Sequence, residues 1–208
     1  MILSVKGGNA DKIHIYIDGE YRMTCDRSFW YSEKWHKIKE IDDKELAALE
    51  SAVNSRRAFK KGMGLLLRRA YSKKEIIQKL TVSFDADTAR EAAQKLEELN
   101  MIDDKNYAEL YADELYNRKK FAPKRILLEL KRKGIDSETA EKAVNSLDKD
   151  DFNRIILLLN SKFKNKLSDE KSVKRTVNSL LRMGYGYSDI RRAVNEVCSG
   201  ADIGDDYE

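Results

Sequence analysis

One apolar pattern recurs along this chain at intervals of about fifty residues, and this recurrence restricts the fold more than any other feature. Shifting the sequence by about fifty residues places Ile76 over Ile126 and Leu80 over Leu130. A second shift of about the same size carries Leu130 to Leu180. Such a period is typical of helical repeat proteins, in which each unit has a small core and neighbouring units stack to complete it.

Local signals place helices inside the repeats. The segment from Ser72 to Glu75 has the pattern of a capping box ahead of an apolar stripe, and Pro123 suits the first turn of a helix. Gly134 stands where a helix ends, with the apolar Ile135 behind it. The chain has one proline in 208 residues, so few breaks are imposed on it and long helices are favoured over a sheet-rich fold.

The sequence therefore predicts a mainly α protein with three tandem three-helix repeats, which form an elongated, curved array behind a small antiparallel β-sheet or hairpin. The expected parts are the sheet with an aromatic cluster, the first repeat with a lead-in helix, the second repeat, the third repeat and an acidic flexible tail. Their expected boundaries are 1–41, 42–102, 103–149, 150–199 and 200–208. The third repeat fits the period only if the residues around 164–168 form a longer connection.

The N-terminal segment has the periodicity of strands. Residues 13–17 alternate apolar and polar side chains, residues 21–25 do the same, and Asp18-Gly19 between them is a turn signal. A further strand around residues 2–5 could join across the glycines that follow it, which would give a small antiparallel sheet.

The register of this hairpin depends on the length of its turn. A two-residue turn would pair Ile17 with Glu20 and mix the two faces. A loop one residue longer pairs Ile17 with Tyr21 and Ile15 with Met23. We expect the longer loop, because it keeps apolar side chains on one face.

Four aromatic residues follow the hairpin, and they have two interpretations. They can seal the small sheet against the first helices, because a sheet of two or three strands needs something to pack on. They can also stack on bases or bind a partner. We expect the sealing role. The residues are Phe29, Trp30, Tyr31 and Trp35.

Familiar catalytic motifs are absent from the sequence. It contains no GxxxxGK[ST] phosphate loop, GxGxxG, HExxH or GxSxG, and we expect His14 and His36 to be structural or solvent-exposed. Cys25 and Cys198 lie far apart without a CxxC companion, so neither a disulfide framework nor a zinc site is predicted. We expect no catalytic residues, no cofactor and no metal.

Cellular location is predicted from what the sequence does not contain. The opening residues lack the apolar run of a signal peptide, and no stretch approaches the roughly 18 apolar residues of a spanning helix. These features predict a soluble, cytoplasmic protein without a membrane partner, and we expect a monomer.

Acidic pairs leave one enzymatic alternative open. A metal-dependent nuclease could use paired carboxylates, but each pair stands at the expected start of a helix. There, carboxylates cap backbone amides and complement the macrodipole, so we expect a capping role. The pairs are Asp42-Asp43, Asp103-Asp104 and Asp150-Asp151.

Basic residues cluster at equivalent places in the repeats, near the junction of the first two helices. The formal net charge is only +4, so a partner must be inferred from the arrangement of charges. If these junctions share one side of the array, they form a basic stripe suited to DNA phosphates or to an acidic groove on a partner protein. Each cluster alone could instead complement a helix dipole or remain solvated. The candidate binding residues are Arg68, Arg69, Lys73 and Lys74 at the first junction; Arg118, Lys119, Lys120, Lys124 and Arg125 at the second, with Lys131 and Arg132 beyond them; and Lys171, Lys174 and Arg175 at the third, near Lys162, Lys164 and Lys166.

Four segments resemble the RecX family of recombination regulators, in the order and spacing of that family. They are 68–76 (RRAYSKKEI), 101–108 (MIDDKNYA), 125–135 (RILLELKRKGI) and 181–185 (LRMGY), with Leu80 and Ile190 beside them. The resemblance covers about residues 55–197. It departs from the family at residues 81–84 (TVSF), where a Lys-Gly turn is typical, and in the displaced first helix of the third repeat.

The resemblance implies a modulator of the RecA recombinase rather than an enzyme. Members of the family have three tandem three-helix repeats, bind the RecA filament on single-stranded DNA, and inhibit its ATP hydrolysis and strand exchange. The implied partners are therefore the RecA filament and single-stranded DNA, with double-stranded DNA as a further candidate. The basic junctions would form the recognition surface. The runner-up is a general nucleic-acid-binding repeat protein without a recombinase partner.

Overall fold

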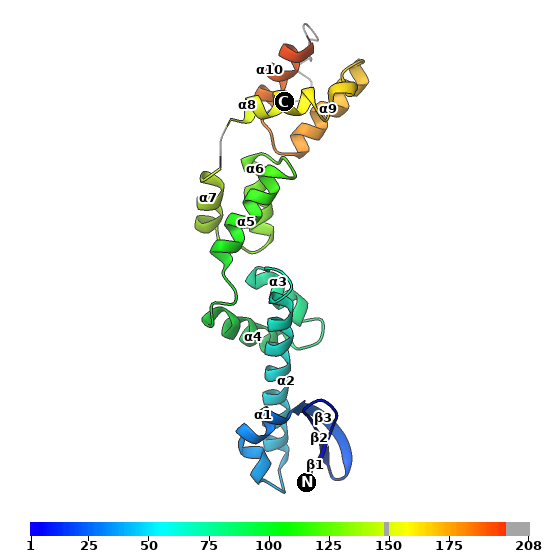
Figure 1. The fold of residues 1–208 in the computed structure, drawn as a ribbon, viewed down its shortest axis with the longest axis vertical. Coiled ribbons are helices and arrows are strands. Elements are labelled where there is room, and N and C mark those ends of the chain that lie inside the picture. The colour runs from blue at the N-terminus through cyan, green and yellow to red at the C-terminus, as the bar shows by residue number, and fades with distance from the viewer. Residues whose placement is uncertain (148–149, 199–208) are drawn as a thin grey trace. The chain divides into compact units, whose positions relative to one another are not determined.

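The structure is a computed structural model that describes residues 1–147 and 150–198, so the expected acidic tail lies outside the described residues (Figure 1). The chain forms two compact units, Met1–Asp103 and Asp104–Glu208. No helix in the described ranges is long and apolar enough to cross a bilayer.

The first unit opens with a three-stranded antiparallel sheet in the order β1-β2-β3. A short helix, α1, and a 3₁₀ turn at Lys34–Lys37 follow it, and three longer helices complete the unit. The strands are β1 (Leu3–Gly7), β2 (Lys12–Ile17) and β3 (Glu20–Asp26), and the helices are α1 (Arg27–Ser32), α2 (Asp43–Leu66), α3 (Lys73–Leu80) and α4 (Ala86–Glu98).

The hairpin register is partly as expected and partly wrong. Ile15 lies opposite Met23, which is confirmed, but Ile17 lies opposite Glu20 and not opposite Tyr21. A register shift between Ile15 and Tyr16 marks a β-bulge, and this bulge accommodates one extra residue of β3 that has no partner on β2. The apolar side chains therefore stay on one face although the turn is short.

The geometry of the turn explains why the expected pairing of Ile17 with Tyr21 is wrong. Asp18 has φ of 50° and Gly19 has φ of 86°, which is the pair of positive values that a two-residue type I′ turn requires. Such a turn matches the right-handed twist of the strands. The side chain of Asp18 also accepts a hydrogen bond from the Ile2 N–H at 2.6 Å, which fixes the turn against the first strand.

The inner face of the sheet is closed by aromatic residues and by α2. Trp30 and Trp35 are 3% and 4% exposed and share a core with Ile15, Leu49 and other buried residues. The sealing role expected for the aromatic cluster is confirmed for the two tryptophans. Tyr31, at 56% exposure, does not take part in it.

Helix α2 is one continuous element that serves both the sheet and the first repeat. Asp42 begins it with a capping box, in which its side chain accepts from the Glu45 N–H. Its N-terminal half contributes Leu49 to the sheet core, and its C-terminal half contributes Ala58 to a second core with α3 and α4. The expected lead-in helix and the first helix of the repeat are therefore the same helix.

The second unit contains two groups of helices. The bounds of the first group are α5 (Asp104–Asn117), α6 (Pro123–Arg132) and α7 (Ser137–Asn145), and those of the second are α8 (Asp151–Asn160), α9 (Glu170–Arg182) and α10 (Tyr187–Cys198). A 3₁₀ turn at Lys164–Lys166 extends the link between α8 and α9, where a longer connection was expected.

The repeated apolar positions form the centre of each bundle. Leu80, Leu130 and Leu180 are all fully buried, and so are Ile76 and Ile126. Their equivalence confirms a mainly α fold built from similar three-helix bundles behind a small sheet. The repeat boundaries and the elongated, curved array stay predictions.

Candidate nucleic-acid interface

The basic residues of the first junction, residues 68–74, have unequal roles. The guanidinium of Arg69 lies 3.7 Å from the centroid of the Tyr71 ring, and Lys73 Nζ lies 2.8 Å from Gln94 Oε1 and 2.7 Å from Glu97 Oε2. Lys73 thus ties the start of α3 to α4. Arg68 and Lys74 are exposed.

The second junction, residues 118–125, contains both exposed and structural cations. Arg118 lies 3.8 Å from Glu114, and Lys119 is exposed beside it. Arg125 makes an ion pair of 2.6 Å with Glu129 one turn along α6. Lys124, by contrast, is exposed and makes no ion pair with any residue that the structure describes.

Residues of the second junction also pack against the third bundle. The Ala122 N–H donates to the Met183 carbonyl at 2.9 Å, and the Tyr185 hydroxyl donates to the Lys120 carbonyl at 3.0 Å. Ala122 belongs to the core of the third bundle. Gly184 faces the backbone of Arg125, and a Cβ at Gly184 would lie 2.9 Å from its backbone nitrogen.

Arg154 of α8 contributes further contacts to the interface between the second and third bundles. Its Nη2 donates to the Tyr116 carbonyl at 2.8 Å, and its guanidinium lies 3.4 Å from the centroid of the Tyr116 ring. Burial raises the pKa of the neighbouring Asp151 and outweighs the opposing effect of Arg154. Burial likewise raises the pKa of Tyr185. The second and third bundles therefore form one packed body.

A groove opens where these two bundles meet, and we call it the Lys124 groove. It has a volume of about 400 Å³, and its cations include Lys124 and Arg182. Gly186 and Tyr187 form its rim at the start of α10. The residues that line it are Lys124, Arg125 and Leu128 from α6, and Leu181, Arg182, Gly184, Tyr185, Gly186 and Tyr187 from the end of α9 and the turn into α10.

Arg182 was not among the sequence candidates, although a signal for it existed. The shift of about fifty residues that carries Leu130 to Leu180 also carries Arg132 to Arg182. Arg182 also lines a second groove, of about 370 Å³, together with Lys166 and Arg175. Arg182 therefore borders both grooves.

The remaining candidates are placed less distinctively. Lys131 lies seven residues after Lys124, so the two share one face of α6, and Arg132 lies 3.1 Å from Glu129. Lys174 pairs with Glu170 at 3.1 Å, and Lys171 is exposed on the first turn of α9.

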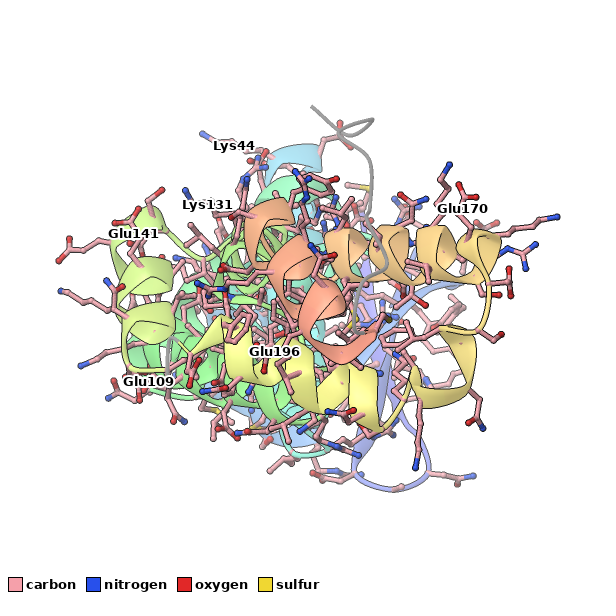
Figure 2. All side chains as sticks on the ribbon, turned by 90° about the horizontal axis from the view of Figure 1, so that it is seen from above. Lys44, Glu109, Lys131, Glu141, Glu170 and Glu196 are labelled. Atoms are coloured by element: carbon pink, nitrogen blue, oxygen red, sulfur yellow. The ribbon has the colours of Figure 1, made fainter. Side chains whose placement is uncertain are left out.

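Charged side chains also cover other sides of the second unit. In Figure 2, Glu141 of α7 and Glu170 of α9 project at opposite sides of it. Charge alone would therefore not single out the Lys124 groove, which differs in its hollow shape and in two cations, Lys124 and Arg182, that make no ion pair with any residue that the structure describes.

The acidic pairs behave as caps where the structure describes their contacts. Asp42 and Asp150 accept from backbone N–H groups at the starts of α2 and α8. A hydrogen bond from the Asn153 side chain and another from its backbone lower the pKa of Asp150. Within the described ranges, no group of three or more His, Cys, Asp or Glu residues is placed to hold a metal ion.

Together these features define a protein of tandem three-helix bundles with basic grooves between helices. Residues 103–144 match the family model "RecX, second three-helix domain". This match and relatives that align over nine-tenths of their own length both support the RecX family for this chain.

Two curated relatives are each named Regulatory protein RecX. The one from Caldanaerobacter subterraneus subsp. tengcongensis is 24% identical over 196 residues, which cover 92% of this chain and 96% of the relative. The one from Clostridioides difficile is 26% identical over 192 residues, which cover 91% of each chain. The family is thus one of regulatory proteins.

Solved structures show the same fold. A crystal structure of regulatory protein RecX superposes with a TM-score of 0.65 at 20% identity and covers 95% of this chain and 98% of that chain. The crystal structure of RecX from Lactobacillus salivarius has a TM-score of 0.55 at 27% identity and covers 71% of this chain and 98% of that chain.

Proposed function

We propose that this chain regulates homologous recombination by binding the RecA filament on single-stranded DNA and lowering its ATPase and strand-exchange activities. The observation that carries the proposal is the Lys124 groove, in which Lys124 and Arg182 are unpaired among the described residues. A nucleoprotein filament offers phosphates and acidic side chains, and both are suitable partners for such cations.

The proposed mechanism is steric and electrostatic. Binding at the groove needs no chemical step, only a rigid body that occupies the surface on which strand exchange depends. The packing of Ala122 against Met183 and of Arg154 against Tyr116 supports this requirement, because it holds Lys124 and Arg182 in a fixed relation. A rigid surface loses less conformational entropy on binding than a flexible one.

The test is single-stranded-DNA-dependent ATP hydrolysis by RecA in the presence of equal or lower amounts of this protein. We expect hydrolysis and strand exchange to fall. The double variant Lys124→Glu and Arg182→Glu should lose most of this inhibition, because it reverses both cations of the groove. The double variant Lys44→Glu and Lys105→Glu is the matched control, since it makes the same total charge change at exposed positions outside the groove. Unchanged ATPase with the wild-type protein would contradict the proposal.

A general nucleic-acid-binding protein would behave differently, and a second measurement separates the two functions. We expect tighter binding to a preformed RecA filament than to the same DNA without RecA. Equal affinities, together with a steep dependence on salt, would favour the general binder.

A further inference from the structure

The outer face of the N-terminal sheet carries an exposed aromatic cluster. Side chains alternate along β2, so Ile13 and Ile15 point into the core while His14 and Tyr16 point outward. Tyr21 of β3 lies directly opposite Tyr16 and is 59% exposed. We call His14, Tyr16 and Tyr21 the aromatic platform.

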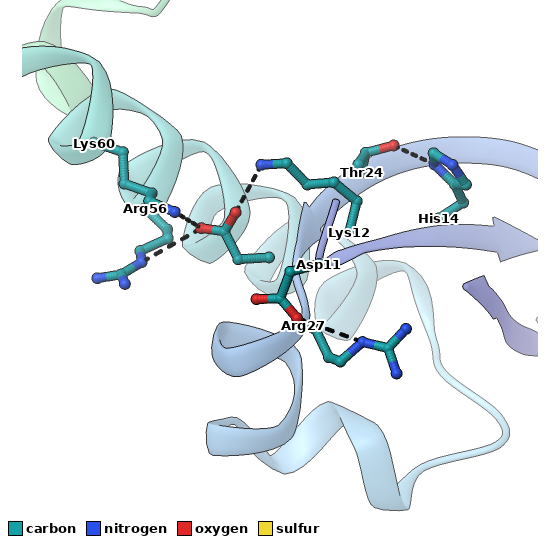
Figure 3. Close-up of polar contacts among 8 residues, drawn as sticks. Asp11, Lys12, His14, Thr24, Arg27, Arg56 and Lys60 are labelled. Atoms are coloured by element: carbon teal, nitrogen blue, oxygen red, sulfur yellow. Dashed lines mark hydrogen bonds and ion pairs between the residues drawn. The ribbon is translucent and has the colours of Figure 1, made fainter. Parts of the chain in front are cut away.

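Hydrogen bonds hold this platform in place. Thr24 Oγ1 lies 2.7 Å from His14 Nδ1 and 3.0 Å from the Tyr21 hydroxyl, so one side chain connects two of the rings (Figure 3 shows the His14 contact). The ring of Tyr21 is edge-on to both His14 and Tyr16, with centroids 6.0 Å apart in each pair. Thr24 and these edge-on contacts therefore link the three rings.

Cations lie beside the platform. Lys6 Nζ is 4.8 Å from the centroid of the Tyr16 ring, and Lys12 lies on the same face of β2. By the alternation of the strands, one acidic strand residue shares this face, Asp26. Its side chain is 8% exposed and is paired with Lys12 and Lys60 at 2.7 Å each. The face therefore presents aromatic rings and positive charge.

A basic cleft adjoins the platform at Lys12, and we call it the Asp26 cleft. Figure 3 shows three of its cations, Lys12, Arg56 and Lys60, around one carboxylate. The cleft has a volume of about 320 Å³, and a single carboxylate faces its cations. Asp26 holds Lys12 and Lys60 and lies 4.0 Å from Arg56 Nε, but one negative charge cannot neutralise the whole set. The lining residues are Lys12, Asp26, Arg56, Arg57, Lys60, Lys61, Ser83 and Phe84.

The segment that departs from the family pattern forms one wall of this cleft. Lys61 Nζ donates to Ser83 Oγ at 2.7 Å and lies 5.8 Å from the centroid of the Phe84 ring. The sequence difference at residues 81–84 therefore coincides with a structural feature of the first unit, the cleft beside the sheet.

We propose that the aromatic platform and the Asp26 cleft form one binding site for single-stranded nucleic acid. A base would stack on Tyr21, whose ring Tyr16 meets edge-on. The exposed Lys6 and Arg57, which make no ion pair with any residue that the structure describes, would contact the phosphates. Stacking requires an unpaired base, so the site selects a single strand over a duplex. This site is separate from the Lys124 groove and needs no recombinase, so it goes beyond the function proposed above.

The first experiment compares a labelled oligothymidylate with an abasic oligomer of the same length, by fluorescence anisotropy with the full chain. We expect the double variant Tyr16→Leu and Tyr21→Leu to weaken oligothymidylate binding by about fivefold or more and to leave abasic binding unchanged, because only stacking is removed. Tyr31→Leu is the matched control, since Tyr31 is an equally exposed tyrosine on α1, away from the platform. Unchanged oligothymidylate affinity in the double variant would overturn the proposal.

The second experiment removes a cation that would bind phosphate. Lys6→Gln should weaken the binding of both oligomers and reduce the slope of log K against log salt by about 0.7 for each phosphate that the variant no longer neutralises. Lys44→Gln is the control at an exposed lysine outside the cleft. If polyglutamate bound as tightly as the oligothymidylate and the tyrosine variants weakened both equally, the site would recognise an acidic peptide, and the proposal would be wrong.

Cross-linking locates the site directly. An oligonucleotide carrying 5-iododeoxyuridine should cross-link to the peptides that contain Tyr16 or Tyr21. These cross-links should persist in the Lys124→Glu and Arg182→Glu variant, so a failure of the proposed function and a failure of this site can be told apart. Cross-links found only between Asp104 and Cys198 would overturn the proposal.

Discussion

The first and second junctions occupy the same place in their repeats but are built differently. Ser72 and Ala122 are equivalent under the shift of about fifty residues, and both are fully buried. Ser72 caps α3 by accepting from the Glu75 N–H, while Ala122 makes no side-chain cap and its N–H donates to the Met183 carbonyl. A repeat position can therefore serve as a helix cap in one unit and as a packing contact in another.

Contacts between elements hold cations differently in the two units, although ion pairs within one helix, such as that of Arg125 with Glu129, occur in the second unit as well. In the first unit, carboxylates hold the cations: Asp26 pairs with Lys12 and Lys60, and Glu97 pairs with Lys73. In the second unit, a backbone carbonyl and an aromatic ring hold Arg154. We therefore expect the first unit to depend on the ionisation of its acids, and the interface of the second to depend on shape.

The largest effect should come from filling the close contact at the second junction. Gly184 has φ of 95°, and a Cβ there would lie 2.5 Å from Arg125 Cβ, so Gly184→Ala introduces both backbone strain and a clash. We expect a decrease of about 2–3 kcal/mol in the free energy of unfolding, measured by chemical denaturation. Gly186→Ala is the control, because a Cβ at Gly186 has only ordinary contacts, and it should change stability by less than about 0.5 kcal/mol. Equal effects of the two variants would mean that the close contact at Gly184 is unimportant.

A smaller effect, with a clear dependence on pH, should follow from Asp26→Asn in the first unit. Burial raises the pKa of Asp26, but hydrogen bonds from Lys12 and Lys60 outweigh it and leave the pKa below its ordinary value of 3.8. A lowered pKa stabilises the fold above about pH 4, and this contribution is lost as the pH falls through the folded-state pKa. At neutral pH we expect Asp26→Asn to cost about 2 kcal/mol.

The pH profile provides the check on this prediction. Stability of the wild type should fall more steeply below about pH 4 than that of Asp26→Asn, because the variant has already lost the ionised group. Thermal unfolding at a series of pH values measures both. Parallel profiles would show that Asp26 does not carry this dependence.

Removing the cap at the first junction tests the junction comparison itself. Ser72→Ala should cost about 1 kcal/mol, because the Glu75 N–H loses its side-chain acceptor. The reciprocal variant, Ala122→Ser, should gain no cap energy, because Pro123 and the contact with Met183 already define that helix start. Equilibrium denaturation of both proteins provides the measurement. A stabilised Ala122→Ser would contradict the proposed difference between the junctions.

The smallest effect should come from Lys73→Met, which removes the link to Gln94 and Glu97. Lys73 is 30% exposed, so the ion pair is partly screened, and we expect a decrease in stability of about 0.5 kcal/mol. Nucleic-acid binding should change less in Lys73→Met than in Lys124→Met, because Lys73 is already engaged in the fold. An equal decrease of binding in the two variants would show that both lysines face the ligand.

Much of the fold could be read from short-range patterns. The capping box at Ser72, the proline at the start of α6 and the positive φ at Gly134 all follow from residues within one helical turn. The hairpin register could not be read in the same way. A two-residue turn and a β-bulge compensate each other, and only the paired strands reveal the bulge.

The candidate site was predicted less completely than the fold. The sequence drew attention to Lys124 through its repeat position, but it gave equal weight to Lys73, which bridges α3 and α4. The residues predicted from the sequence did not include Arg182, although the repeat alignment places it opposite Arg132. The aromatic residues expected to seal the sheet do so at Trp30 and Trp35, while the exposed rings on the outer face come from the strands themselves.

The sequence by itself determined the repeat, the helices and their caps, because apolar periodicity and capping depend on neighbours within a few residues. Tertiary structure decided which cations are engaged and which are available, because their partners lie far away in the sequence. Lys60 meets Asp26 across 34 residues, and Tyr185 reaches Lys120 across 65. Such contacts arise only when the elements have packed together, so the surfaces they create are properties of the folded chain.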